Sequence, residues 1–98
     1  MTEAEKALVC AAVFSNQAIS QTGVLPEQFS CDNGRKIWQT MLSIHASGDP
    51  VDAITLQAKL KGDAVAMRLL GESLSGQASA ANAEAYAKAV IEDATRRD

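Results

Sequence analysis

An eight-residue stretch without a polar side chain, residues 7–14 (ALVCAAVF), is the feature that most constrains how this chain folds. Thr2 and Glu5 precede it with the Thr-x-x-Glu spacing of a capping box, which predicts a helix from Glu3 to about Ser15. On a helix this stretch is apolar on every face, and such a helix is surrounded by its neighbours rather than lying on the surface. We therefore expect the first helix to form the central axis of the core.

Further segments repeat apolar residues at helical spacing, and none alternates as a strand does. They are a short turn at 18–22, helices at 32–46, 54–60 and 64–74, and a last helix that ends near residue 97. A chain of 98 residues is long enough for one core but not for two. The sequence therefore predicts an all-α fold, a compact orthogonal bundle of about five to six helices, with residues 1–98 forming a single domain.

Polar residues at the starts of these segments are the expected helix caps. The candidates are Asp32 or Asn33 for the third segment, Asp52 for the fourth, and Ser79 or Asn82 for the last. The last helix reaches the end of the chain with no glycine or proline to stop it. We therefore expect it to continue in a longer parent protein.

The connector before residue 32 contains three apolar residues, Val24, Leu25 and Phe29, which we expect to anchor it on the core. Phe29 and Trp38 could instead stack on the bases of a single strand. Trp38 falls on the apolar face of the helix at 32–46, however, so we expect it in the core.

The charge of the chain argues against nucleic acid as a partner, and its short apolar runs argue against a membrane. The net charge is −3, and the only adjacent basic pairs are Arg35-Lys36 and Arg96-Arg97, whereas DNA-binding domains usually present a basic stripe. We therefore expect little or no direct DNA binding. The longest apolar run has eight residues, whereas a membrane-spanning helix needs about 20, and the acidic N-terminus does not resemble a signal peptide. We expect a soluble, cytoplasmic protein.

A phosphate-binding loop is suggested only by the spacing of Gly71 and Gly76. That motif continues with Lys and then Ser or Thr, which contact the phosphates and the magnesium ion, whereas this chain continues with Gln77 and Ala78. We expect a loop of small residues there and no nucleotide site.

The remaining polar candidates do not form a catalytic or metal-binding set. His45 is the only histidine, and with Cys10 and Cys31 it gives three possible zinc ligands at unrelated spacings. Asp49 and Asp52 form a carboxylate pair, but capping accounts for Asp52. We expect a buried Cys10, a partly exposed Cys31, no disulfide, and no catalytic residue, metal or cofactor.

The helix at 64–74 has more apolar surface than one core-facing stripe requires. Its apolar residues span an arc of about 200°, whereas a stripe that faces one core covers roughly 100°. Part of this surface is therefore expected to face a partner. The candidate contact residues are Met67, Leu70 and Leu74.

Taken in order, these segments resemble the N-terminal domain of DnaB-type replicative DNA helicases. The opening EAEKALVCAAVFSN is similar to the start of that domain. The segment from Phe29 to Leu60 resembles its pattern of a Phe, a turn, an Ile-Phe-like pair (here Ile37-Trp38), a helix that ends in Ser-Gly, and then Pro-Ile-Asp-x-x-Thr-Leu. The segment SAANAEAYAKAV resembles its Ser-Ala-Ala-Asn, Tyr-Ala, Val pattern.

The resemblance implies a helical head domain that sits above the ATPase ring of such a helicase and has no catalytic site of its own. Its partners would be copies of itself or neighbouring helicase subunits, and a primase or helicase regulator. Two alternatives stay open. One is a free-standing adaptor or inhibitor with this fold, which the Met1 directly before the first helix favours. The other is the helicase-binding C-terminal domain of a primase.

Overall fold

The computed structural model describes residues 1–97, and these form helices joined by short connections. The first helix, α1 (Glu3–Phe14), begins at the capping box that its sequence predicts. The Thr2 hydroxyl accepts a hydrogen bond from the backbone N–H of Glu5, and the Glu5 carboxylate accepts one from the backbone N–H of Thr2. Each side chain thereby satisfies a backbone donor that the first helical turn leaves free.

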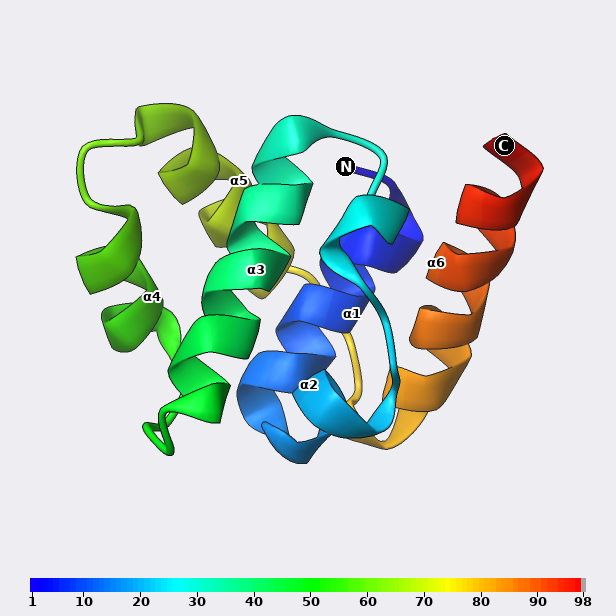
Figure 1. Cartoon of the computed structure of the whole chain (residues 1–98), viewed down its shortest axis with the longest axis horizontal. Coiled ribbons are helices and arrows are strands. Elements are labelled where there is room, and N and C mark those ends of the chain that lie inside the picture. The colour runs from blue at the N-terminus through cyan, green and yellow to red at the C-terminus, as the bar shows by residue number, and fades with distance from the viewer. Residues whose placement is uncertain (98) are drawn as a thin grey trace.

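Seven further elements follow α1 in the chain (Figure 1). They are α2 (Gln17–Gln21), the 3-10 turn η1 (Pro26–Gln28), α3 (Asp32–Ala46), α4 (Ala53–Leu60), α5 (Ala64–Leu74), the 3-10 turn η2 (Ala80–Asn82) and α6 (Ala83–Arg97). No strand occurs within residues 1–97. The predicted all-α bundle is confirmed.

The central position predicted for α1 is also confirmed. Helices α5 and α6 both pack on α1, α3 packs against α5 and α4, and η1 lies between α3 and α6 (Figure 1). Leu8, Val9 and Ala11 in the middle of α1 are completely buried. Phe14 is a correction to the expected all-round burial, because its side chain at the end of α1 is 71% exposed.

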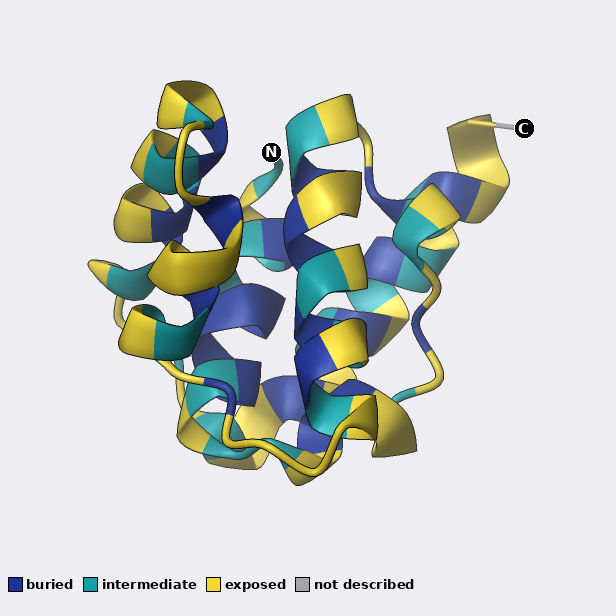
Figure 2. Ribbon diagram, turned by 60° about the vertical axis from the view of Figure 1, so that its left-hand side comes forward, coloured by how far each residue is buried: buried dark blue, intermediate teal, exposed yellow. Residues whose placement is uncertain are grey.

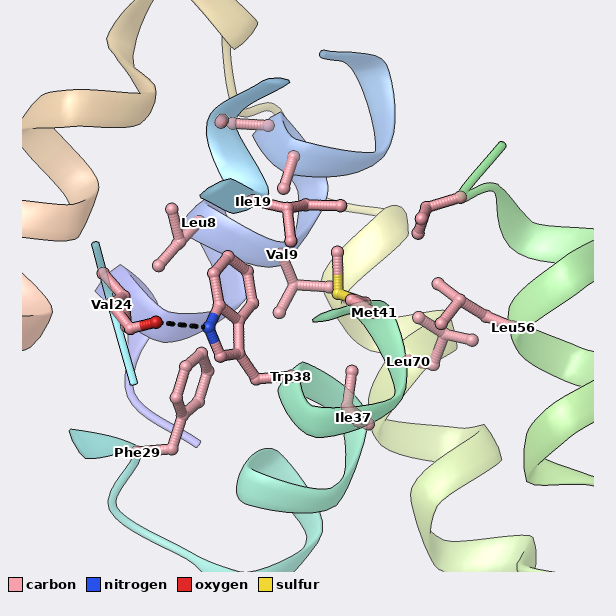
Figure 3. Packing of buried hydrophobic residues seen from close by; sticks show 14 of the residues in the cluster. Leu8, Val9, Ile19, Val24, Phe29, Ile37, Trp38, Met41, Leu56 and Leu70 are labelled. Carbon is pink, nitrogen blue, oxygen red and sulfur yellow. Dashed lines mark hydrogen bonds between the residues drawn. The ribbon is translucent and has the colours of Figure 1, made fainter. Parts of the chain in front are cut away.

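The core is built around Trp38 on α3 (Figure 3). Its ring stacks on that of Phe29 with 5.5 Å between the centroids, and both residues are completely buried. The indole Nε1–H donates a 2.9 Å hydrogen bond to the carbonyl of Val24, so the connector before η1 is fastened to α3. The predicted core positions of Trp38, Phe29 and Val24 are confirmed, whereas Leu25 does not anchor the connector, since it is 50% exposed.

The start of α3 differs from the expected one. Its N-cap is Cys31, whose Sγ accepts a hydrogen bond from the backbone N–H of Gly34, rather than Asp32 or Asn33. A side chain at position 34 would be crowded, because a Cβ there would lie 3.1 Å from the Phe29 ring. The N-cap role of Asp52 for α4 is confirmed, and Ser79 caps η2, the turn that leads into α6. Cys10 is buried and Cys31 partly exposed, as expected, and both are free thiols.

The side-chain amide of Asn16 forms hydrogen bonds with two parts of the chain that are distant in sequence. Its amide Nδ2 donates to the carbonyls of Ala12 and Val51, both at 2.9 Å, and to that of Val13 at 3.3 Å. Its Oδ1 accepts a 2.9 Å hydrogen bond from the backbone N–H of Val51. The amide therefore satisfies carbonyls at the end of α1 and fixes the connector between α3 and α4 against them.

A buried carboxylate makes a second link of this kind. Glu5 is 1% exposed, and besides its bond from Thr2 it accepts 2.8 Å hydrogen bonds from the backbone N–H and the hydroxyl of Ser30. A buried charge is tolerated when hydrogen-bond donors surround it, and here three donors do. The start of α1 is thus tied to the loop that precedes α3.

No helix among residues 1–97 is long and apolar enough to cross a membrane.

Candidate functional site

The polar residues that the sequence singled out lie apart from one another. His45 is half-buried near the end of α3, with Nε2 3.4 Å from the Ser20 hydroxyl oxygen. Asp49 is exposed, and Asp52 is engaged in capping α4. Among residues 1–97, no three His, Cys, Asp or Glu side chains are close enough to hold a metal ion.

The two glycines with phosphate-loop spacing, Gly71 and Gly76, lie in different structural elements. Gly71 lies inside α5, whereas Gly76 lies in the connection that follows this helix. A phosphate-binding loop needs several consecutive N–H groups that are free of helical bonding. This geometry does not provide such a loop at residues 71–76.

Helix α5 is held at its start by Asp63. The Asp63 carboxylate accepts a 3.0 Å hydrogen bond from the backbone N–H of Ala66 and forms an ion pair with the Lys36 ammonium on α3. The hydrogen bond from Lys36, together with that from Ala66, lowers the pKa of Asp63 from its ordinary value. The pair fixes the first turn of α5 beside α3.

The wide apolar arc of α5 is mostly covered within the domain. Leu70 belongs to the buried core (1% exposed; Figure 3), so it is not available as a surface contact. Met67 and Leu74 are partly buried and pack against the core. Of the apolar residues on α5, Val65 is the large exposed one, at 45%. The outer face of this helix carries exposed and half-buried residues, as the outward sides of the helices do in Figure 2, and is therefore less apolar than the sequence predicts.

Exposed apolar side chains also lie on other helices. Ile54 on α4 is 78% exposed and Phe14 at the end of α1 is 71% exposed. The sequence predicts Phe14 inside a buried helix and a helix at 54–60, but neither prediction identifies these side chains as exposed. Periodicity identifies which residues share a face of a helix, but it does not reveal whether another element covers that face.

A pocket of about 440 Å³ lies between the start of α1, the end of α5 and α6. Its polar groups include Glu3 and Lys6, whose charged atoms are 3.8 Å apart, and the Tyr86 hydroxyl, which accepts a 3.2 Å hydrogen bond from the backbone N–H of Ser79. Nucleophilic or acid–base catalysis needs an activated group with a partner within hydrogen-bond reach. The described groups of this pocket do not form such a pair.

Comparison with known proteins identifies related domains. The family model described as the DnaB-like helicase N-terminal domain matches residues 1–92. The structure is similar to the crystal structure of the N-terminal domain of DnaB helicase from Mycobacterium tuberculosis, with a TM-score of 0.85 and 27% sequence identity. That match covers 97% of this chain and 74% of the other. Among curated proteins, no sequence matches.

Proposed function

Because this chain belongs to the DnaB-like helicase N-terminal domain family, we propose that it acts by associating with helicase subunits and by docking a primase or a helicase regulator. A domain of this family is non-catalytic, and the 98 residues do not include the helicase ATPase domain. The observation that carries the proposal is the family match over residues 1–92. The match to a helicase domain favours this role over that of a primase C-terminal domain.

The charge and the surface of the domain support protein rather than DNA as its partner. With a net charge of −3 the chain lacks the positive charge that phosphate neutralisation requires. The role in replication implies the cytoplasm as its location. In this role residues 1–98 act as a single head domain.

The proposed association surface on α5 consists of Met67, Leu74 and Val65. Buried Leu70 is left out of it, and exposed Val65 is added. Met67 and Leu74 expose only part of their side chains, whereas Val65 is exposed enough to contact a second molecule without rearrangement. Apolar contacts of this kind contribute through the surface that they remove from water.

Sedimentation velocity over a range of concentrations tests this surface. We expect concentration-dependent self-association that Val65→Glu and Met67→Glu weaken, since each places a charge in the contact. Ile54→Glu is the matched control, because it makes the same change at an exposed site on α4. Thermal melting identifies any loss of fold in Met67→Glu, whose side chain packs partly against the core.

A monomer at every concentration, combined with no binding to the cognate helicase or primase in a pull-down, would contradict the proposal. An adaptor or inhibitor with this fold would bind the cognate helicase without joining it as a subunit. The reading frame separates these two roles, since a frame that continues past residue 98 into a Gly-Lys-Thr motif indicates a helicase subunit.

A further inference from the structure

The two adjacent basic pairs, Arg35-Lys36 and Arg96-Arg97, each direct one arginine into the same cleft, while the other basic residue of the pair lies outside it. Arg35 on α3 and Arg97 on α6 both line a cleft of about 250 Å³ beside η1. Lys36 and Arg96 do not line it and are paired with carboxylates, Lys36 with Asp63 and Arg96 with acidic residues one turn earlier on α6. Figure 1 shows η1 between the start of α3 and the last turns of α6.

Both guanidinium groups are held in place by backbone carbonyls. Arg97 Nη2 donates a 2.7 Å hydrogen bond to the carbonyl of Gln28, and Arg35 Nε donates a 3.0 Å hydrogen bond to that of Phe29. These are consecutive carbonyls at the end of η1. Each guanidinium has five N–H donors, so most of its donors remain available after one such bond.

Within residues 1–97, the acidic groups around the cleft offset the charge of the two arginines only in part. Asp32 approaches Arg35 only to 3.7 Å and is 99% exposed, which makes it a weak surface pair. Among residues 1–97, no carboxylate lies within ion-pair distance of Arg97. Glu27 lines the cleft and opposes one of the two positive charges, so the lining residues keep one net positive charge.

We infer that this cleft binds a single carboxylate side chain on an acidic segment of a partner protein. Guanidinium groups bind carboxylates through paired hydrogen bonds in a fixed plane, and the carbonyl bonds already hold both groups in place. One net positive charge matches the single negative charge of a carboxylate rather than a phosphate dianion. Leu25, which lines the cleft and is half exposed, provides an apolar contact for the residue next to that carboxylate.

The whole chain has a net charge of −3, so it does not attract acidic peptides in general. Binding of such a peptide therefore reports on a local arrangement of charge. This inference goes beyond the association role proposed above and does not depend on it, because the binding is measured on the chain alone.

The probe is the peptide acetyl-Gly-Leu-Glu-Gly-amide, titrated at low salt into the isotope-labelled 98-residue chain and followed by NMR amide shifts. We expect saturable shifts at Leu25, Gln28 and Thr95 with a dissociation constant on the order of 1 mM. The matched peptide with Gln in place of Glu is expected to bind about tenfold more weakly, because its hydrogen bonds lose the charge.

Adjacent basic residues provide the matched variants. Arg97→Gln and Arg35→Gln should each weaken binding about fivefold or more, whereas Arg96→Gln and Lys36→Gln, which remove the same charge beside the cleft, should change it less than about twofold. Arg35→Lys and Arg97→Lys keep the charge but lose the planar fork, so an intermediate loss is expected and folding is left intact.

Three results would overturn the inference. They are the absence of saturable shifts around η1, equal weakening by all four Gln variants, and tighter binding of inorganic phosphate than of the Glu peptide. The last result would identify the cleft as a phosphate site instead.

Discussion

Replacing Asn16 by alanine should lower the free energy of unfolding by about 3 kcal/mol. The substitution removes three hydrogen bonds of 2.9 Å and one of 3.3 Å, and a bond of this kind contributes roughly 1 kcal/mol net. We count the three short bonds fully and neglect the long one. The loss falls on Val51 above all, because this residue is 1% exposed and water does not readily replace the amide at its backbone groups.

Urea unfolding followed by the fluorescence of Trp38, the single and fully buried tryptophan, measures this loss. The midpoint should fall while the slope stays the same, since the surface exposed on unfolding is unchanged. In thermal melting the loss corresponds to roughly 12–24 °C for a domain of this size. Gln17→Ala is the control, because Gln17 is the exposed neighbour of Asn16, and its effect should stay within about 0.5 kcal/mol.

Asn16→Asp separates the donor role from the acceptor role. A carboxylate still accepts from the N–H of Val51, but it faces three carbonyls to which the amide now donates. At neutral pH it should be at least as destabilising as alanine. The reasoning fails if alanine costs less than about 1 kcal/mol, or if aspartate is tolerated as well as asparagine.

Three further outcomes are expected. Trp38→Phe should lower the free energy of unfolding, followed by circular dichroism, by about 2–3 kcal/mol, because it removes the indole hydrogen bond and leaves a void of roughly 40 Å³ in a closed core. A loss below about 1 kcal/mol would show that the core closes around the smaller ring. Because the folded pKa of Asp63 is lowered, the Lys36 pair stabilises the fold above the ordinary value of 3.8 and loses this effect as the pH falls through the lowered pKa. The difference in melting temperature between wild type and Asp63→Asn should therefore shrink below pH 3.8, and a constant difference would refute this. In the native protein a thiol reagent should modify the partly exposed Cys31 first, and Cys10 should react only at the rate of unfolding; equal rates would contradict the burial.

The helices themselves were largely predictable from the sequence. The bounds of α3 and α5 agree with the apolar periodicity, because Gly48 and Pro50 follow α3 and Gly62 and Gly76 lie on either side of α5. The cap of α3 was not predictable in this way. Cys31 replaces the expected Asp32 because its sulfur reaches the N–H of Gly34, and cysteine is not among the preferred cap residues.

The surface could be predicted only in part. A helical pattern states that Leu70 lies on an apolar face, but the position of α1 and α3 around α5 decides that it is buried. The cleft beside η1 shows the same limit more strongly. Arg35 and Arg97 come from two helices, and only the tertiary arrangement directs them to neighbouring carbonyls.

The packing of α6 on α1 also determines when this domain can fold during its synthesis. Helix α1 leaves the ribosome before α6, yet each covers part of the other. Until the segment of Ala87 and Val90 has emerged, one side of the apolar stretch at residues 7–14 has no partner within the domain. A nascent chain of this protein therefore exposes its most apolar helix until α6 has emerged, and the packing of α6 on α1 then completes the core.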